Sequence, residues 1–232
     1  CTSGGGASNA PGGAGDAAAS FSSDSTMGKV EAAGKLVCGT KFDVVGFGFK
    51  NPTNSEVEGL DADLCREIAK AIGVTPEFVE AISANRLPFL KEDKVDIVIS
   101  TMTVTDERKR EIDFSKVYYK AGQSILVKKA STVQKVEDLS GKKVCSGEGS
   151  TSEKNVRAKA PTAELLLFKT YAEAGQALAD GRCEAVSTDD TILFGLAQKI
   201  ANTELRGGQF TAEPLGIGIK KGMDDFVAFI NL

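Results

Sequence analysis

The sequence contains no histidine. Histidine is the commonest metal ligand and the only side chain whose ordinary pKa lies near neutral pH. Its absence excludes the Ser-His and Cys-His nucleophile pairs of hydrolases, and it excludes any zinc site that uses an imidazole. An enzyme with this composition would depend on carboxylates, lysines and tyrosines. The composition therefore disfavours catalysis without excluding it, and we predict a protein without catalytic residues, without a metal site and without a cofactor.

Other features are missing as well. No apolar run reaches the roughly 18 residues that can span a bilayer. The 28 lysines and arginines are interspersed with 32 aspartates and glutamates, so the chain lacks the basic patch of a nucleic-acid-binding surface. No repeat of about 20–50 residues is present, which excludes a solenoid. In SGEGSTSEK (146–154), Lys154 follows a glutamate rather than a glycine, so the loop does not match a nucleotide-binding Walker A motif.

The N-terminal segment is rich in Gly, Ala and Ser and has almost no large apolar residue. Such a segment cannot bury enough surface to offset its ordering entropy, so we expect a flexible tether over residues 1–24. The chain begins with Cys1. A cysteine before such a tether is typical of a mature bacterial lipoprotein, so we predict lipid on the thiol of Cys1. The alternative is that this cysteine is incidental.

Four cysteines remain: Cys38, Cys65, Cys145 and Cys183. None forms a CxxC pair, which excludes clustered metal motifs and thioredoxin-type motifs. Outside the cytoplasm, an even number of cysteines favours disulfides. Their order along the chain favours Cys38–Cys65 and Cys145–Cys183, with buried free thiols as the alternative.

Strand and helix patterns alternate after a short helix that ends at Gly34. This alternation predicts an α/β fold with a mostly parallel sheet. The pattern occurs once before YYKAG (118–122) and once after it, which predicts two lobes, at 25–118 and 119–213, with a return to the first lobe over 214–232. Strands are expected at 35–40, 77–81, 95–100, 124–129, 142–147, 164–169, 183–188 and 215–221. Helices are expected at 60–72, 86–93, 105–112, 151–160, 171–180 and 191–201.

Polar residues follow several of these strands, where open α/β sheets bind their ligands. In VISTMTVTDERKREIDFS (98–115), Thr105 is a suitable N-cap and Arg108 lies one turn into the helix. The planar guanidinium of Arg108 matches a carboxylate with two parallel hydrogen bonds. The alternative is a surface ion pair of Arg108 with Asp106 or Glu111.

Two strand ends in the second half of the chain complement this arginine. In SGEGSTSEK, a helix begins at Ser150 or Thr151, and its free N–H groups can bind an anion. In STDDTI (187–192), Asp190 is a plausible N-cap, and Asp189 can point into a cleft and accept a cation. The alternative is that these residues only cap helices. Together, the three strand ends complement a zwitterion.

A longer pattern covers about residues 25–232. GLDADLCREIAKAI (59–72) resembles a signature of the extracytoplasmic solute-binding proteins (family 3) that serve polar amino acid ABC importers. The resemblance continues through SANRLPFL, VDIVISTMTVTDERKREIDFS, GKKVCSGEGSTS and STDDTILFG to PLGIGIKKG. It implies the type II periplasmic-binding-protein fold, in which two α/β lobes are joined by two hinge crossings. Family members usually continue beyond FVAFIN, so we expect an incomplete, truncated C-terminal return to the first lobe.

The resemblance also implies how the α-carboxylate of an amino acid would be held. Arg108 and the backbone N–H of Thr103 would bind it from the first lobe. Ser150 and Thr151 would close on it from the second lobe.

The remaining implied roles concern the ammonium and the side chain of the ligand. Asp189 would take the ammonium, with help from the carbonyl of Ser100 and the hydroxyl of Thr101. Lys41 and Arg86 would face the ligand side chain. A buried carboxylate requires a cation, so these two residues favour an acidic side chain.

We therefore predict a monomeric receptor, anchored by lipid to the outer face of the cell membrane, that delivers an acidic amino acid to an ABC permease. The KFD…GFG…N run at 41–51 resembles the glutamate-binding lipoproteins of high-GC Gram-positive bacteria, so glutamate is the expected ligand and aspartate its close relative. One alternative is a neutral polar ligand such as glutamine, with Arg86 and Lys41 paired to protein carboxylates. Others are a dehydratase that uses Glu148 as its acid, and an adhesion or sensor protein.

Overall fold

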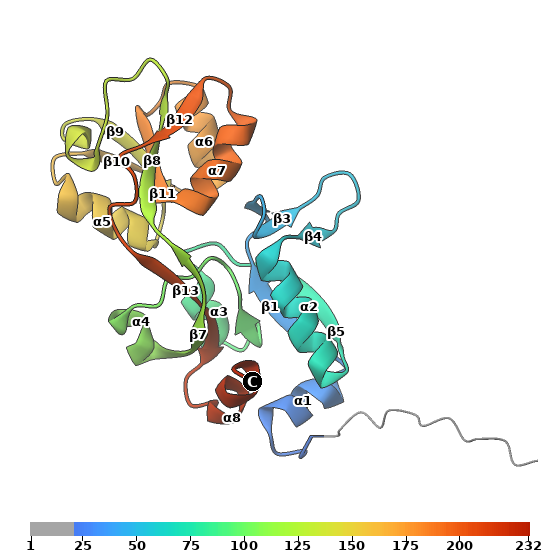
Figure 1. Ribbon diagram of the computed structural model, residues 1–232. Helices are drawn as coiled ribbons and strands as arrows, with labels where there is room; N and C mark the ends of the chain where they lie inside the picture. The colour runs from blue at the N-terminus through green and yellow to red at the C-terminus, as the bar shows by residue number, and fades with distance from the viewer. Residues whose placement is uncertain (1–20) are drawn as a thin grey trace, which may run out of the picture.

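A computed structural model describes residues 21–232, so Cys1 and most of the predicted tether lie outside the described residues. The chain forms two lobes, each built on a five-stranded sheet, and the strands β7 and β13 run between them (Figure 1). The helices are α1 (Thr26–Ala33), α2 (Leu60–Ile72), α3 (Arg86–Lys91), α4 (Asp106–Glu111), α5 (Thr151–Lys159), α6 (Tyr171–Ala179), α7 (Asp190–Lys199) and α8 (Asp224–Ile230), with a 3-10 turn η1 (Val136–Leu139). The strands are β1 (Lys35–Thr40), β2 (Asp43–Val44), β3 (Gly48–Lys50), β4 (Val57–Glu58), β5 (Thr75–Glu80), β6 (Ile97–Val98), β7 (Ile112–Ala121), β8 (Gln123–Lys128), β9 (Lys143–Gly147), β10 (Glu164–Phe168), β11 (Ala185–Asp189), β12 (Thr203–Arg206) and β13 (Glu213–Lys220).

The two large sheets share one plan. The first-lobe sheet has the order β5-β1-β6-β13-β7 and the second-lobe sheet the order β10-β9-β11-β8-β12. In each, the first three strands are parallel and the last two join antiparallel. The predicted α/β class and the two lobes are confirmed. The prediction of a mostly parallel sheet is wrong, because two of the four strand pairs in each lobe are antiparallel. Antiparallel strands need no crossover helix, so the chain can pass between lobes directly on a strand.

Capping residues fix the ends of several helices. Thr105 caps α4, because its hydroxyl accepts from the N–H of Arg108 at 3.2 Å, and Ser150 caps α5 in the same way. Gly34 ends α1 and Gly73 ends α2, both with positive φ, a conformation in which glycine avoids the steric cost of a Cβ. The strand predicted at 95–100 is shorter than expected, since only Ile97–Val98 pairs in the sheet before the chain turns away.

The two hinge crossings lie side by side. The first passes through Gly122, between β7 and β8, and the second enters β13, where Glu213 pairs with Ala121. Asp190 ties α7 to both crossings, because its carboxylate accepts from the N–H of Gly122 at 3.3 Å and from the amide of Gln209 at 2.6 Å. Asp190 was predicted to be the N-cap of this helix; that prediction is wrong, since Asp189 occupies the cap position.

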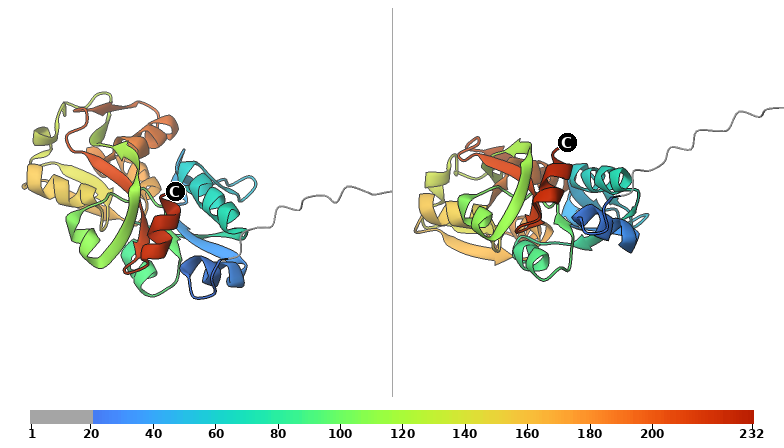
Figure 2. Two further views of the ribbon diagram at one scale, coloured as in Figure 1. Left: turned by 60° about the horizontal axis from the view of Figure 1, so that its bottom comes forward. Right: turned by 90° about the horizontal axis from the view of Figure 1, so that it is seen from below.

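The lobes are in contact across the space between them (Figure 2). Val44 and Phe47 of the first lobe belong to the same buried apolar cluster as Leu178 and Leu193 of the second lobe. The carboxylate of Asp43 accepts from the first two N–H groups of α6, at 2.6 and 3.1 Å. Apolar and polar contacts therefore both hold this closed arrangement.

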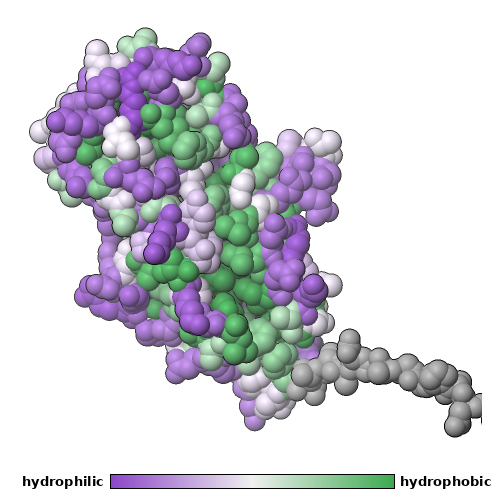
Figure 3. All heavy atoms as spheres, viewed as in Figure 1, coloured by the Kyte–Doolittle hydropathy of each residue, from purple (hydrophilic) through white to green (hydrophobic). Residues whose placement is uncertain are grey.

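The surface reflects this organisation. Figure 3 shows polar residues over much of both lobes and apolar residues gathered along the middle of the first lobe, between α2 and the crossing strands. Val117 and Tyr119 of β7 are among the exposed large apolar side chains. Within residues 21–232, no helix combines the length and the apolar character that crossing a bilayer requires.

Both predicted disulfides are present, so the alternative of free thiols is excluded. Cys38–Cys65 joins β1 to α2 within the first lobe, and Cys145–Cys183 joins β9 to the segment before β11 within the second. All four cysteines are buried. Each bridge constrains one lobe and leaves the crossings between the lobes unconstrained.

Loss of the first-lobe bridge should destabilise the protein. Replacing Cys38 and Cys65 together by serine opens a loop with a sequence separation of 27 residues. The greater freedom of the unfolded chain should then lower the free energy of unfolding by about 3 kcal/mol, measured by urea denaturation. The matched control replaces Cys145 and Cys183 in the second lobe. Recovery of differently paired cysteines in a non-reducing peptide map would contradict this pairing.

Candidate functional site

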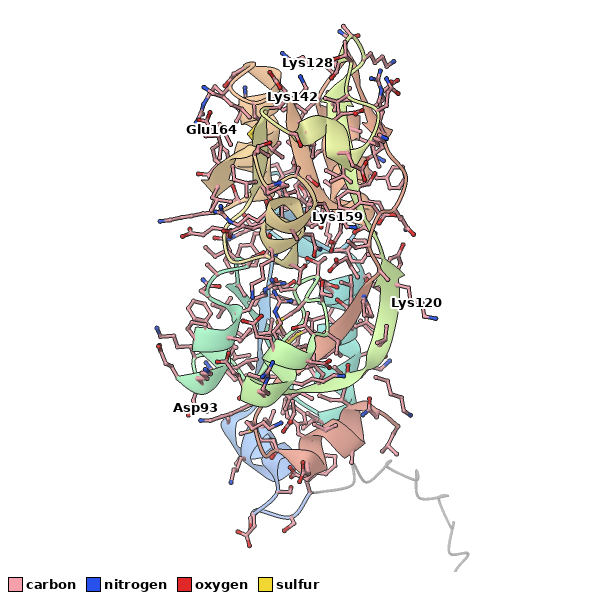
Figure 4. The ribbon with its side chains drawn as sticks, turned by 90° about the vertical axis from the view of Figure 1, so that its left-hand side faces the viewer. Asp93, Lys120, Lys128, Lys142, Lys159 and Glu164 are labelled. Carbon is pink, nitrogen blue, oxygen red and sulfur yellow. A yellow bond between two sulfur atoms is a disulfide. The ribbon has the colours of Figure 1, made fainter. Side chains whose placement is uncertain are left out.

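The space between the lobes concentrates buried charge. Six charged side chains are buried in the described part of the chain: Lys41, Asp61, Arg86, Arg108, Asp189 and Glu213. Lys120 and Glu164, by contrast, are exposed on the outside of the molecule (Figure 4). Burying charge is costly unless it is hydrogen-bonded or paired, so three cations and three carboxylates in one place indicate a functional site.

The loop after β6 forms the centre of the site. Thr101 has a φ of 42°, which non-glycine residues rarely adopt and which is typically found at functional sites. Its N–H donates to Asp61 at 2.8 Å, and the other oxygen of Asp61 accepts from the hydroxyl of Tyr118, also at 2.8 Å. The hydroxyl of Thr101 is buried and has no hydrogen-bond partner among the described residues. The loop is thus held in a strained conformation in which the hydroxyl of Thr101 remains without a hydrogen-bond partner.

Lys41 and Arg86 approach the same loop. Nζ of Lys41 donates to the hydroxyl of Ser83 at 3.2 Å and to the carbonyl and hydroxyl of Ser100 at 3.3 Å. Nη1 of Arg86 donates to the carbonyls of Ser100 and Thr101 at 2.9 and 3.1 Å. Burial, and then the positive charge of Arg86, lowers the pKa of Lys41 well below its usual value. These cations are bound to neutral oxygens, so the predicted alternative in which they pair with protein carboxylates is not observed.

Arg108 is buried as well. Its Nη1 donates to the carbonyl of Thr103 at 2.7 Å. The alternative of a surface ion pair is excluded, because Asp106 pairs with Lys109 and Glu111 with Lys91. Burial lowers the pKa of Arg108, and the carboxylate of Glu213 opposes that shift.

A pocket of about 360 Å³ opens onto this arginine. Ser83, Leu87 and Arg108 line it from the first lobe, and Gly149, Thr151 and Lys154 line it from the second. Lys154 also pairs with Glu107 across the lobes. The pocket is therefore a product of closure.

The start of α5 meets the first lobe. Oγ1 of Thr151 lies 3.3 Å from Oγ1 of Thr103, which brings together two residues that were predicted to share a ligand. Their hydroxyl protons are already used, since each donates to Glu213. The hydroxyl of Ser150 donates to the carbonyl of Gly147 at 2.7 Å. The N–H of Glu153 donates to the capping hydroxyl of Ser150, so the groups left to bind an anion here are the backbone N–H groups of Thr151 and Ser152.

Asp189 faces the cations from the second lobe. It ends β11 at the cap position of α7, but its side chain makes no capping bond. Burial, and then the carboxylate of Glu213, raises the pKa of Asp189 to about 7. Burial lowers the pKa values of both Arg86 and Arg108, and the charge of Asp189 opposes that shift. Cations from one lobe and an anion from the other thus share one electrostatic environment.

Two members of the site had no predicted role. Asp61 lies four residues before Cys65, on the buried face of α2. An acidic residue at that spacing from a buried cysteine was the sequence signal that could have identified it as a buried charge. Asp63 differs, since it is exposed and pairs with Arg66. Glu213 stands before Pro214 outside any periodic pattern, so its position gave no signal. No group of three or more potential metal ligands occurs among the described residues.

Several known proteins are similar to this chain in sequence. The family described as bacterial extracellular solute-binding proteins, family 3, matches residues 36–232. The ABC transporter glutamine-binding protein GlnH of Bacillus subtilis (strain 168) is 45% identical over 210 residues, which cover 89% of this chain and 77% of that protein. The glutamate-binding protein GluB of Corynebacterium efficiens is 33% identical over 213 residues, covering 85% and 72%.

A solved structure shows the same fold. An ancestral arginine-binding protein bound to glutamine superposes with a TM-score of 0.82 at 39% identity, over 85% of this chain and 89% of that one. The family match extends from β1 to the last residue, and it includes every buried charge of the site. The chain therefore belongs to the bacterial extracellular solute-binding proteins of family 3.

Proposed function

We propose that this protein captures L-glutamine outside the cytoplasm and delivers it to an ABC permease, as a non-enzymatic monomer anchored by lipid on Cys1. The observation that carries the proposal is the set of three buried cations and three buried carboxylates between the lobes. A zwitterion adds no net charge to this balanced set. Charge-assisted hydrogen bonds in such a space are each worth roughly 1.5–3 kcal/mol.

The α-carboxylate would lie between Arg108 and the first turn of α5. Arg108 uses Nη1 to hold the carbonyl of Thr103, which leaves other guanidinium donors for a ligand. The N–H groups of Thr103 and Thr151 would complete the site, since free N–H groups at a helix start favour an anion. This retains Arg108, Thr103 and Thr151 of the predicted residues, assigns the contribution of Thr151 to its backbone, and leaves out Ser150, whose hydroxyl and N–H both donate to the carbonyl of Gly147.

The ammonium would lie against Asp189. This carboxylate is buried and opposes the first-lobe cations, as expected of a partner for a positive group. The unpaired hydroxyl of Thr101 offers a further acceptor nearby. The carbonyl of Ser100 would contribute only in part, because it already accepts from Lys41 and Arg86.

The ligand side chain would end at Lys41 and Arg86. A glutamine carbonyl can accept from these cations and leave the overall charge unchanged. The 45% identity to a glutamine-binding protein favours this ligand over the acidic amino acid expected from the sequence. L-Glutamate is the second candidate, because no ion pair of Lys41 or Arg86 occurs among residues 21–232 and a carboxylate would complete one with either.

A dehydratase would need an acid beside the substrate. Glu148, the candidate for that role, is exposed to solvent, although it lines the same pocket as Arg108. This position supports binding rather than catalysis.

Arg108 should be essential for capture. L-Glutamine should raise the melting temperature of the wild-type protein, and Arg108→Ala should weaken binding by at least about 100-fold, because a buried anion loses its partner. Isothermal titration calorimetry measures the affinity. Arg110→Ala is the control, since Arg110 is exposed on the same helix. Wild-type affinity in Arg108→Ala would overturn the proposed site.

Lys41 should distinguish the two candidate ligands. Lys41→Met keeps the length of the side chain and removes its charge. L-Glutamate should then bind at least about tenfold more weakly, whereas L-glutamine should change much less, since a charged acceptor gains more from the cation. Calorimetry with both ligands gives the ratio, and Lys70→Met on the exposed face of α2 is the control. Equal losses for both ligands would contradict a side-chain role for Lys41.

Binding should depend on pH through Asp189. Its pKa is about 7, and an ammonium binds the ionised form, so affinity should fall as pH decreases below 7, by at most about tenfold per unit. The chain has no histidine to titrate in this range. Calorimetry between pH 5.5 and 8 measures the slope, and Asp189→Asn should bind weakly with a flat profile. A flat wild-type profile would contradict the assignment of the ammonium to Asp189.

A further inference from the structure

Glu213 accepts hydrogen bonds from four side chains. It begins β13 at the second hinge crossing and is only 3% exposed. One carboxylate oxygen accepts from the hydroxyls of Thr103 and Thr151, at 2.8 and 2.9 Å. The other accepts from the amide of Asn155 at 2.9 Å and from the hydroxyl of Thr211 at 2.7 Å. The acceptor capacity of the carboxylate is therefore filled.

These donors come from three parts of the molecule. Thr103 belongs to the first lobe, Thr151 and Asn155 belong to α5 of the second lobe, and Thr211 belongs to the crossing itself. A single carboxylate thus joins both lobes to the hinge. This set of contacts can be complete only when the lobes are closed.

The contacts also fix the direction of two hydroxyl groups. An ionised carboxylate only accepts hydrogen bonds, and a threonine hydroxyl has one proton to donate. Thr103 and Thr151 each spend that proton on Glu213. Neither can then donate to a ligand, and the oxygen lone pairs that remain can only accept.

We propose that Glu213 is a positioning residue for ligand capture. When the lobes close, its carboxylate accepts hydrogen bonds from the hydroxyls of Thr103 and Thr151. These bonds tie both lobes to the hinge strand and leave the two hydroxyls unable to donate, so that only the backbone N–H groups of these residues can donate to the ligand carboxylate. The proposal rests on the proposed function only for the choice of ligand in the test.

Replacing the carboxylate by an amide tests both parts of this role. In Glu213→Gln, an amide nitrogen facing the hydroxyls would reverse their direction, and the carboxylate charge would be lost. L-Glutamine should bind at least about tenfold more weakly by calorimetry, and small-angle X-ray scattering of the ligand-free protein should give a larger radius of gyration than wild type. Glu107→Gln, which breaks the exposed interlobe pair with Lys154, is the control and should bind within about twofold of wild type, as expected for a surface ion pair.

A second pair of variants covers the case in which Glu213→Gln fails to fold. Thr151→Val removes one hydroxyl at nearly constant shape, and Thr151→Ser restores it. The valine variant should bind L-glutamine more weakly and the serine variant like wild type. In the double variant with Glu213→Gln, the losses should be less than additive, because the two residues act through one hydrogen bond.

The outcomes separate this inference from the proposed function. Wild-type affinity in Glu213→Gln or in Thr151→Val would overturn the role of Glu213, even if Glu213→Gln were less stable. If neither the wild type nor Glu107→Gln binds L-glutamine, the proposed function fails. Scattering of the ligand-free proteins then tests the role of Glu213 in closure by itself. A more expanded Glu213→Gln protein would support the role in closure, and an unchanged radius would overturn it.

Discussion

Buried charge between the two lobes is the constraint on which the rest of the structure depends. A charged side chain away from water needs a hydrogen-bonding partner, and one of these charges, Glu213, finds its partners only where both lobes meet. Arg86 and Lys41 use the carbonyl of Ser100 in the first lobe, whereas Glu213 needs donors from both lobes. The strained turn at Thr101, the capped start of α5 and the contact of Asp43 with α6 all serve to bring these groups together.

The balance of this charge also bears on what the protein binds. Two cations, Lys41 and Arg86, suggested an acidic ligand side chain when only the sequence was considered. The structure adds Asp61 and Glu213 to the predicted Asp189, which makes the buried basic and acidic side chains equal in number. A balanced site favours a zwitterion with an uncharged side chain, in agreement with the glutamine-binding relative. The positions of the charges then matter more for ligand choice than their sum. Lys41 and Arg86 belong to the first lobe, whereas Asp189 belongs to the second.

The sequence predicted much of this site because its residues follow strands and begin helices. Arg108 could be placed from the cap at Thr105, and Thr151 from the two glycines before it, since these are local rules. Glu213 obeys no local rule, because its partners at 103, 151 and 155 are brought to it only by the fold. The antiparallel halves of the two sheets were missed for the same reason. Only the two end residues of β7, Ile112 and Ala121, are buried, so the strand lacks the apolar alternation that identifies a strand in a sequence.

The pairing of Ala121 with Glu213 places both crossings in one ladder. Two independent linkers would allow the lobes to twist, slide and bend separately, whereas two strands of one ladder restrict them to a shared axis. Each lobe is also stiffened internally by its own disulfide. The relative orientation of the outer surfaces of the two lobes then depends on whether a ligand is bound between them. A partner in the membrane could distinguish loaded from unloaded protein by touching only the outside of the two lobes, without reaching the ligand.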